Sequence, residues 1–177
     1  ADVVEFAIAP NNNQVLYVIK GNALFKTTNG GTSWTTITGT LPVGSAQMTY
    51  LAVDPTDANN VFVTFSGYSA GNKVFVSTNG GTNWANISTG LPNLPVNCIV
   101  YQPGSNDGIY VGCDVGVYYR DNTNSTWSAY NTGLPNAPIA DLEIYVPTLK
   151  LRAATYGRGV WEVDAMNPGN LAPVADF

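Results

Sequence analysis

Carboxylates are the side chains of this sequence that could carry out chemistry, because none of its 177 residues is a histidine. Without histidine there is no Ser-His-Asp triad, no Cys-His nucleophile and no imidazole ligand for a metal ion. Glycoside hydrolysis remains open, since it needs two carboxyl groups that flank the scissile bond. Seven acids could in principle form such a pair: Asp54, Asp57, Asp107, Asp114, Asp121, Asp141 and Glu143. Most of them lie within two residues of Pro, Gly or Asn, where Asp commonly forms turns, so we expect no catalytic residue.

The two cysteines, Cys98 and Cys113, are expected on neighbouring strands of one hairpin whose centre falls near residues 105 and 106. That register places them opposite each other, so a disulfide is conceivable in an oxidising compartment. The alternative interpretation is a pair of small, buried apolar side chains. A zinc site would need two further ligands, which the sequence does not offer, so we expect no metal site and no cofactor.

The charge and composition exclude several partners. The chain has 12 acidic and 7 basic residues, a net charge of -5, and 45% apolar residues. This is typical of a folded protein, and seven scattered cations can hardly build a surface for nucleic acid. No apolar run approaches the roughly 20 residues that span a bilayer, so we expect no membrane insertion. The start ADVVEFAIAP has neither an initiator Met nor a signal segment, so the chain looks processed or excised.

An internal repeat predicts the elements that position these side chains. Three boxes align without gaps: TTNGGTSW at 27–34, STNGGTNW at 77–84 and RDNTNSTW at 120–127. A Leu-Pro step follows each box, at 41–42, 91–92 and 134–135. Upstream, apolar strands end at four prolines: Pro10, Pro55, Pro103 and Pro147. Two short β runs separated by a turn follow each proline, and a further stretch follows each box tryptophan.

Units of about 40 to 50 residues with four antiparallel strands are typical of β-propeller blades. The sequence therefore predicts an all-β fold of about four blades, at approximately 1–45, 46–93, 94–137 and 138–164, the last without its outermost strand. Two explanations of the short last blade remain open. Either the chain is part of a larger propeller with further blades, or the four blades form an open array with exposed edges.

The boxes resemble the BNR or Asp-box motif, S-x-D-x-G-x-T-W, of sialidases, sortilin-type receptors, xyloglucan-degrading glycosidases and photosystem assembly propellers. Asparagine occupies the acidic position of the motif in all three boxes and can still fold its side chain back onto nearby amides. In the third box Asn124 stands in place of the motif glycine. Asparagine enters the left-handed region more easily than other residues, so this substitution is tolerable and predicts a degraded version of the loop. The resemblance implies a structural staple with the tryptophan packed under the turn, formed by Thr27, Asn29, Gly31, Trp34, Ser77, Asn79, Gly81, Trp84, Asn122 and Trp127.

The resemblance also implies where a ligand would bind. In this family the ligand face collects the loops between the second and third strands of each blade and the loops between blades. Tyr68, Asp114, Tyr156 and Arg158 fall in such loops here. A sialidase would also need an arginine cluster, which is not matched: the arginines are Arg120, Arg152 and Arg158, the last two in one hairpin.

The end of the chain resembles two features of secreted bacterial proteins. PVADF, within a linker segment at 165–177, resembles the first strand of a PKD-like, immunoglobulin-like module. ATYGRGVWEVD resembles the closing blade of Asp-box propellers in secreted Bacteroidota proteins, including cargo of type IX secretion. These resemblances imply a large multidomain protein that is secreted or held at the cell surface.

The leading functional hypothesis is a non-catalytic binding or structural propeller module. Its partners would be a glycan or protein at the ligand face and the remaining blades and domains of the parent chain. Two alternatives remain open: the C-terminal part of a xyloglucanase-like glycoside hydrolase, and a sortilin-like propeller that binds peptides.

Overall fold

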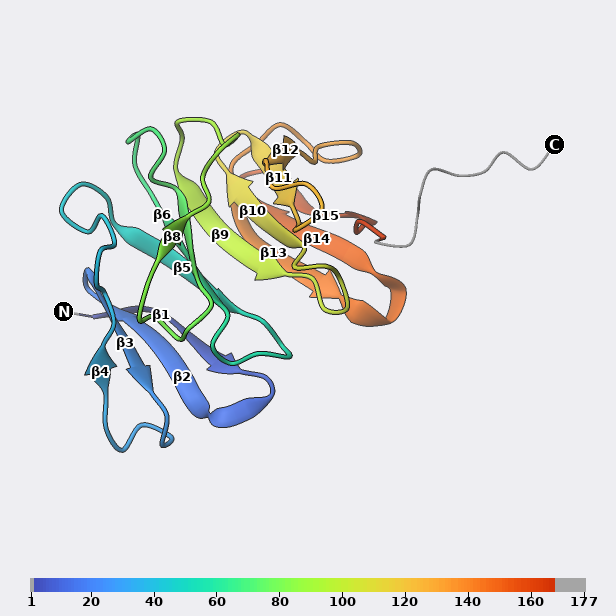
Figure 1. Cartoon of the computed structure of the whole chain (residues 1–177). Helices are drawn as coiled ribbons and strands as arrows, with labels where there is room; N and C mark the ends of the chain where they lie inside the picture. Colours follow the sequence, from blue (N-terminus) through green and yellow to red (C-terminus); the bar gives the residue numbers. More distant parts are fainter. Residues whose placement is uncertain (1, 168–177) are drawn as a thin grey trace.

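The computed structural model describes residues 2–167, which fold into four antiparallel sheets that follow one another along the chain (Figure 1). Three sheets have four strands and the last has three. The predicted all-β architecture of propeller blades is thereby confirmed. The PKD-like segment predicted within 165–177 lies outside the described residues, apart from the first three.

Each sheet is one blade, with its strands in sequence order from one edge to the other. Blade 1 contains β1 (Val3–Ala9), β2 (Asn12–Lys20), β3 (Ala23–Thr27) and β4 (Thr35–Thr36). Blade 2 contains β5 (Met48–Val53), β6 (Val61–Phe65), β7 (Val74–Ser77) and β8 (Ala85–Asn86). Blade 3 contains β9 (Val96–Tyr101), β10 (Ile109–Cys113), β11 (Gly116–Arg120) and β12 (Ser128–Ala129). Blade 4 contains β13 (Ile139–Tyr145), a short 3-10 helix η1 (Val146–Thr148), β14 (Lys150–Thr155) and β15 (Gly159–Asp164).

The core consists of three apolar layers, one between each pair of successive blades. One layer joins blades 1 and 2, a second joins blades 2 and 3, and a third joins blades 3 and 4. β6 and β10 are buried on both faces because a blade packs against each side of them. The outermost strands β4, β8 and β12 are only two residues long and exposed.

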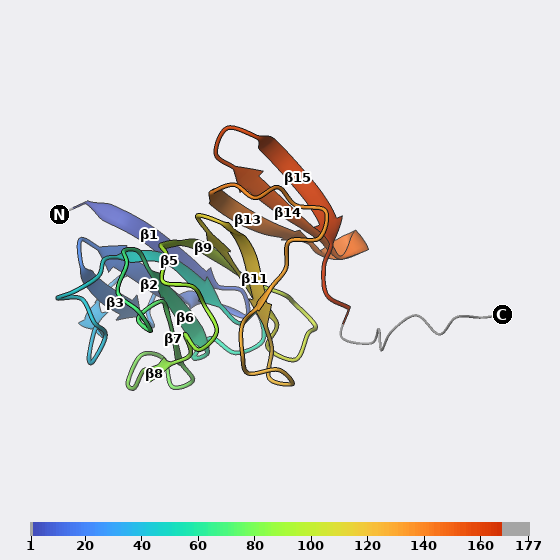
Figure 2. The ribbon, with the colours of Figure 1, turned by 90° about the horizontal axis from the view of Figure 1, so that it is seen from above.

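The first strands of the four blades lie next to one another, as Figure 2 shows for β1, β5, β9 and β13. Together they line a hollow of about 330 Å³ that includes Tyr50, Tyr101 and Leu142. Each antiparallel sheet has two kinds of turn at opposite ends. Turns between first and second strands lie at one end, and turns between second and third strands lie at the other.

The two cysteines do not form a disulfide. β9 and β10 pair with Cys98 opposite Gly112, and a register shift after Gly112 leaves Cys113 opposite Val96. Cys98 therefore packs in the layer between blades 3 and 4, whereas Cys113 packs in the layer between blades 2 and 3. Both thiols are free and buried. Of the two interpretations that the sequence left open, the structure therefore shows the pair of small buried side chains, because a disulfide would need both side chains on one face of the sheet.

Both thiols should be unreactive in the folded protein. Burial raises the pKa of the Cys113 thiol to about 12, and it also raises the pKa of Cys98. We expect a thiol-specific reagent to label neither cysteine at pH 8 and both after denaturation in guanidinium chloride. Rapid labelling of one cysteine without denaturant would contradict this burial.

Candidate functional site

The first two boxes are loops held by their own side chains. Thr27 Oγ1 accepts the Gly31 amide at 3.0 Å, and Asn29 Oδ1 accepts the Ser33 amide at 2.9 Å. The second box repeats these contacts, with Ser77 Oγ accepting the Gly81 amide at 2.7 Å. Every polar group of these contacts is used inside the loop, which leaves little of the box for a ligand.

The third box is built differently from the prediction. Asp121 Oδ1 accepts the amides of Thr123 and Asn124, at 2.9 and 2.6 Å, so Asp121 takes the capping role predicted for Asn122. The side-chain Nδ2 of Asn122 instead donates to Asp107 Oδ2 at 2.5 Å. Asn124 does not adopt a positive φ, because this loop closes without the glycine turn of the other two boxes.

The box tryptophans join successive blades. Trp84 Nε1 donates to the Ile37 carbonyl of blade 1 at 2.9 Å, and Trp127 Nε1 donates to the Ile87 carbonyl of blade 2 at 2.6 Å. Trp127 is 3% exposed, whereas Trp34 in blade 1 is 42% exposed, because no described residue precedes it as a blade. The tryptophan therefore reaches beyond its own turn, which the sequence comparison of the boxes did not predict.

The outer face of blade 1 is apolar and open. A hollow of about 400 Å³ on this face is lined by Val3, Val18, Lys20, Phe25 and Trp34. Phe6 and Ile8 on β1 are also about half exposed. This face corresponds to the faces of blades 2 and 3 that pack on the blade before them.

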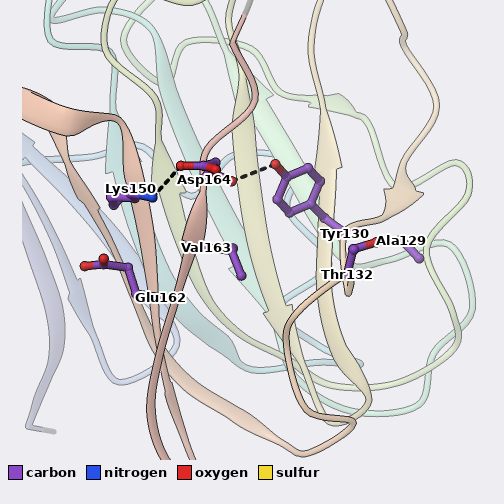
Figure 3. Close-up of a pocket in the computed structure, with 7 residues that line it drawn as sticks. All are labelled: Ala129, Tyr130, Thr132, Lys150, Glu162, Val163 and Asp164. Carbon is purple, nitrogen blue, oxygen red and sulfur yellow. Dashed lines mark hydrogen bonds and ion pairs between the residues drawn. The ribbon is translucent and has the colours of Figure 1, made fainter. Parts of the chain in front are cut away.

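Blade 4, the last blade of the array, carries charged side chains on its outer face. On blade 4, Arg152 Nε lies 2.9 Å from Glu162 Oε2, and the Arg152 guanidinium lies 4.6 Å from the centre of the Tyr145 ring. A hollow of about 530 Å³ beside β15 contains the Lys150–Asp164 ion pair and Tyr130, whose hydroxyl donates to the Asp164 carbonyl (Figure 3). The two ends of the array thus differ: one is apolar and the other is polar.

The four residues of the predicted ligand face occupy turns between second and third strands. Tyr68 and Tyr156 are 68% and 81% exposed, and Arg158 is exposed as well. Asp114 is half-buried and accepts a hydrogen bond from Asn97 Nδ2 at 3.0 Å. These residues therefore share one end of the sheets, although no hydrogen bond or ring contact joins any two of them within residues 2–167.

A group of polar residues on the first strands was missed by sequence reasoning. The hydroxyl of Tyr50 on β5 donates to Asp141 Oδ1 on β13 at 3.1 Å. Burial raises the pKa of Glu5 on β1, the Phe6 amide lowers it, and the charge of Asp141 raises it further. From the sequence, Asp141 was only one of seven candidate acids for a catalytic pair. Glu5 and Tyr50 could have been found only by aligning positions on the first strands of different blades.

Among residues 2–167 no group of three or more His, Cys, Asp or Glu side chains is placed to hold a metal ion. The described part of the chain also contains no helix that is long and apolar enough to cross a membrane.

The chain resembles solved β-propeller structures. No family model matches it, and neither does any curated protein. YCF48 bound to D1 peptide is 18% identical with a TM-score of 0.65, over 96% of this chain and 52% of that one. The GH74 xyloglucanase from Xanthomonas campestris is 14% identical with a TM-score of 0.74, over 93% and 29%. An auxiliary nutrient binding protein from Bacteroides thetaiotaomicron is 11% identical with a TM-score of 0.70, over 92% and 38%.

The chain thus spans between roughly a third and a half of the length of these structures. At such low identities the likeness shows the fold alone.

Proposed function

We propose that this chain is a non-catalytic propeller segment of a larger secreted or cell-surface protein, and that it contacts a glycan or protein through its ligand face. The observation that carries the proposal is the exposure of Tyr68 and Tyr156, with Arg158, on turns at one end of the sheets. Exposed aromatic rings with polar tips supply contact area at little entropic cost and are common in binding sites. The peptide complex of the YCF48 structure supports this kind of partner.

The open face of blade 1 supports the second part of the proposal, a larger propeller. In blades 2 and 3 the indole N–H of the box tryptophan binds a carbonyl of the preceding blade. The Trp34 indole has no such partner among residues 2–167, and an apolar hollow surrounds it. A preceding blade of the same kind would bury this face and accept the hydrogen bond.

The binding proposal is tested with glycan and peptide arrays. We expect the wild-type chain to bind a member of one array, and replacement of both Tyr68 and Tyr156 by alanine to weaken binding by about tenfold or more, as for aromatic hot spots. Tyr145→Ala is the matched control, because Tyr145 is an exposed tyrosine on the outer face of blade 4. The proposal would be contradicted by no binding on either array, or by equal losses in both variants.

The raised pKa of Glu5, to which burial and the charge of Asp141 contribute, supports a second candidate function, glycoside hydrolysis. A carboxyl group with a raised pKa can act as general acid while a nearby carboxylate acts as nucleophile or base. The Xanthomonas neighbour is a xyloglucanase. Release of reducing sugar from xyloglucan or another glycan, with loss of about a thousandfold or more in both Glu5→Gln and Asp141→Asn, would establish this function. No release across a broad panel would reject it.

A further inference from the structure

Blade 4 lacks the contact that joins blades 2 and 3 to the blade before them. In those two blades the indole N–H of the box tryptophan donates to a carbonyl of the preceding blade, at Ile37 and Ile87. The sequence has no fourth box, and β15 leads directly into a short stretch of chain. We call residues 164–167 the exit segment. Blade 4 is therefore held to blade 3 by other contacts, and the exit segment makes several of them.

Tyr130 of blade 3 binds the start of the exit segment. Ile37 and Ile87 both stand three residues after the tryptophan of their own box. Tyr130 stands at the same distance from Trp127, the tryptophan of the third box. Its hydroxyl donates to the Asp164 carbonyl at 2.8 Å, as Figure 3 shows. The position whose carbonyl accepts the tryptophan in blades 1 and 2 thus supplies a donor to the exit segment in blade 3.

Two buried side chains of blade 3 clamp the backbone of Met166. The Met166 amide donates to the Tyr110 hydroxyl at 2.5 Å, and Gln102 Nε2 donates to the Met166 carbonyl at 2.5 Å. The Tyr110 hydroxyl in turn donates to Gln102 Oε1 at 3.0 Å. Tyr110 is fully buried and Gln102 is 1% exposed. The three groups form a closed ring of hydrogen bonds away from water, where a polar group that loses its partner is costly.

A short turn in blade 4 lies beside the exit segment. The turn between the first and second strands covers residues 54–60 in blade 2 and 102–108 in blade 3, but only 146–149 in blade 4. The amide of Ala165 donates to the Leu149 carbonyl of this turn at 2.7 Å, and Ala165 is 6% exposed. The exit segment therefore adds backbone at the place where blade 4 has the shorter turn.

A comparison of equivalent tyrosines shows what the exit segment replaces. Tyr17 in blade 1 and Tyr110 in blade 3 each stand seven residues after the strand-ending proline, and both are fully buried. The Tyr17 hydroxyl donates to the Ala58 carbonyl, in the longer turn of blade 2, at 2.8 Å. The Tyr110 hydroxyl binds Met166 of the exit segment instead. In both cases a buried tyrosine joins its blade to the backbone of the next unit.

We propose that the exit segment is a latch that holds blade 4 on blade 3, in place of the tryptophan contact between the other blades. No blade follows blade 4 among residues 2–167, and its last strand β15 is mostly exposed. Such a blade would open locally at a lower free energy than the blades before it. The latch opposes this opening, because blade 4 can leave blade 3 only when the exit segment detaches from Tyr110, Gln102 and Tyr130.

The latch also fixes the direction in which the chain leaves blade 4. Gln102 lies in the turn between β9 and β10, whereas Tyr68 and Tyr156 lie in turns between second and third strands, at the opposite end of the sheets. The path of the exit segment therefore leaves the predicted ligand face uncovered. The latch does not depend on the proposed binding function, since no residue of the ligand face takes part in it.

Hydrogen–deuterium exchange of the whole chain, followed by mass spectrometry of its peptides, tests the latch. Tyr110→Phe keeps the ring but removes the hydroxyl that accepts the Met166 amide and donates to Gln102. We expect the protected amides of β13, β14 and the exit segment to exchange about tenfold faster than in the wild-type chain. Exchange in blades 1 and 2 should stay the same.

Tyr17→Phe is the matched control, because it removes an equally buried hydroxyl that joins blade 1 to blade 2. Its exchange should rise in those two blades and not in blade 4. The latch is refuted if blade 4 exchanges at the wild-type rate in the Tyr110 variant. It is equally refuted if that variant accelerates all four blades alike, or if the Tyr17 variant has the same effect on blade 4.

The two cysteines supply a second measurement within one chain. Cys98 packs in the layer between blades 3 and 4, and Cys113 packs in the layer between blades 2 and 3. Gln102→Glu replaces the Nε2 donor by an oxygen that repels the Met166 carbonyl, with little change in side-chain size. We expect a thiol reagent to label Cys98 about tenfold faster or more in this variant, with Cys113 unchanged. Unchanged labelling of Cys98, or equal acceleration at both cysteines, would rule out the latch.

Discussion

Replacing Trp127 by alanine is expected to lower the free energy of unfolding by about 3–5 kcal/mol, as for large buried aromatic side chains. Trp127 is almost fully buried between blades 2 and 3, and its indole N–H donates to the Ile87 carbonyl. Without the indole, that carbonyl would keep only the longer hydrogen bond from Arg120 Nη1, at 3.3 Å. For a chain of this size the change corresponds to a decrease in Tm of about 6–20 °C. Urea or thermal unfolding followed by circular dichroism measures it.

The matched control is the same replacement in the first box. Trp34 occupies the equivalent position but lacks a preceding blade among the described residues, so Trp34→Ala is expected to cost less than about 1 kcal/mol in this chain. In the intact parent protein the cost at Trp34 should approach that at Trp127 if another blade covers this face. Equal losses at the two positions in the isolated chain would contradict the role of the tryptophan as a contact between blades.

Gly81→Ala is expected to destabilise the chain by about 2–6 kcal/mol, for two reasons. Gly81 has a φ of +90°, a conformation that costs an L-residue roughly 1–3 kcal/mol. A Cβ at this position would also lie 2.4 Å from Ile37 Cδ1 of blade 1, and such overpacking typically costs a further 1–3 kcal/mol. The free energy of unfolding in urea, with its m-value, measures the change.

Gly31→Ala separates these two contributions. Gly31 has nearly the same φ, +93°, but its nearest contact would be the ring of Trp34 at 3.7 Å, which is ordinary van der Waals distance. It should therefore show the backbone cost alone, and the difference between the two variants measures the packing of blade 2 on blade 1. A Gly31 variant as unstable as the Gly81 variant would mean that packing between blades contributes nothing at this position.

Much of the fold was predictable because its determinants are local and repeated. The boxes, the strand-ending prolines and the alternating apolar runs recur in each unit, so each blade could be recognised from its own residues. The missing fourth strand of blade 4 was predicted because no fourth box is present in the sequence. The four residues of the predicted ligand face could be assigned to equivalent turns from the same repeat.

The errors arose where one residue of register or one neighbouring blade decides the outcome. The shift after Gly112 moves Cys113 to the other face of the sheet, and a hairpin centre estimated from sequence cannot detect such an irregularity. In the third box, Asp121 takes the role predicted for Asn122 because Asn122 reaches Asp107 instead. That second contact depends on how the loop before β10 lies beside the box.

By itself the sequence determined the class of fold, the order of the strands and the chemistry that is absent for lack of histidine. These follow from composition and from patterns that repeat within each blade. Only the tertiary structure decided which residues of different blades meet: Trp127 with Ile87, Tyr50 with Asp141, and Tyr101 with Asp54. The physical reason is that these contacts join residues about 40 or more positions apart, and packing of whole blades sets their distance.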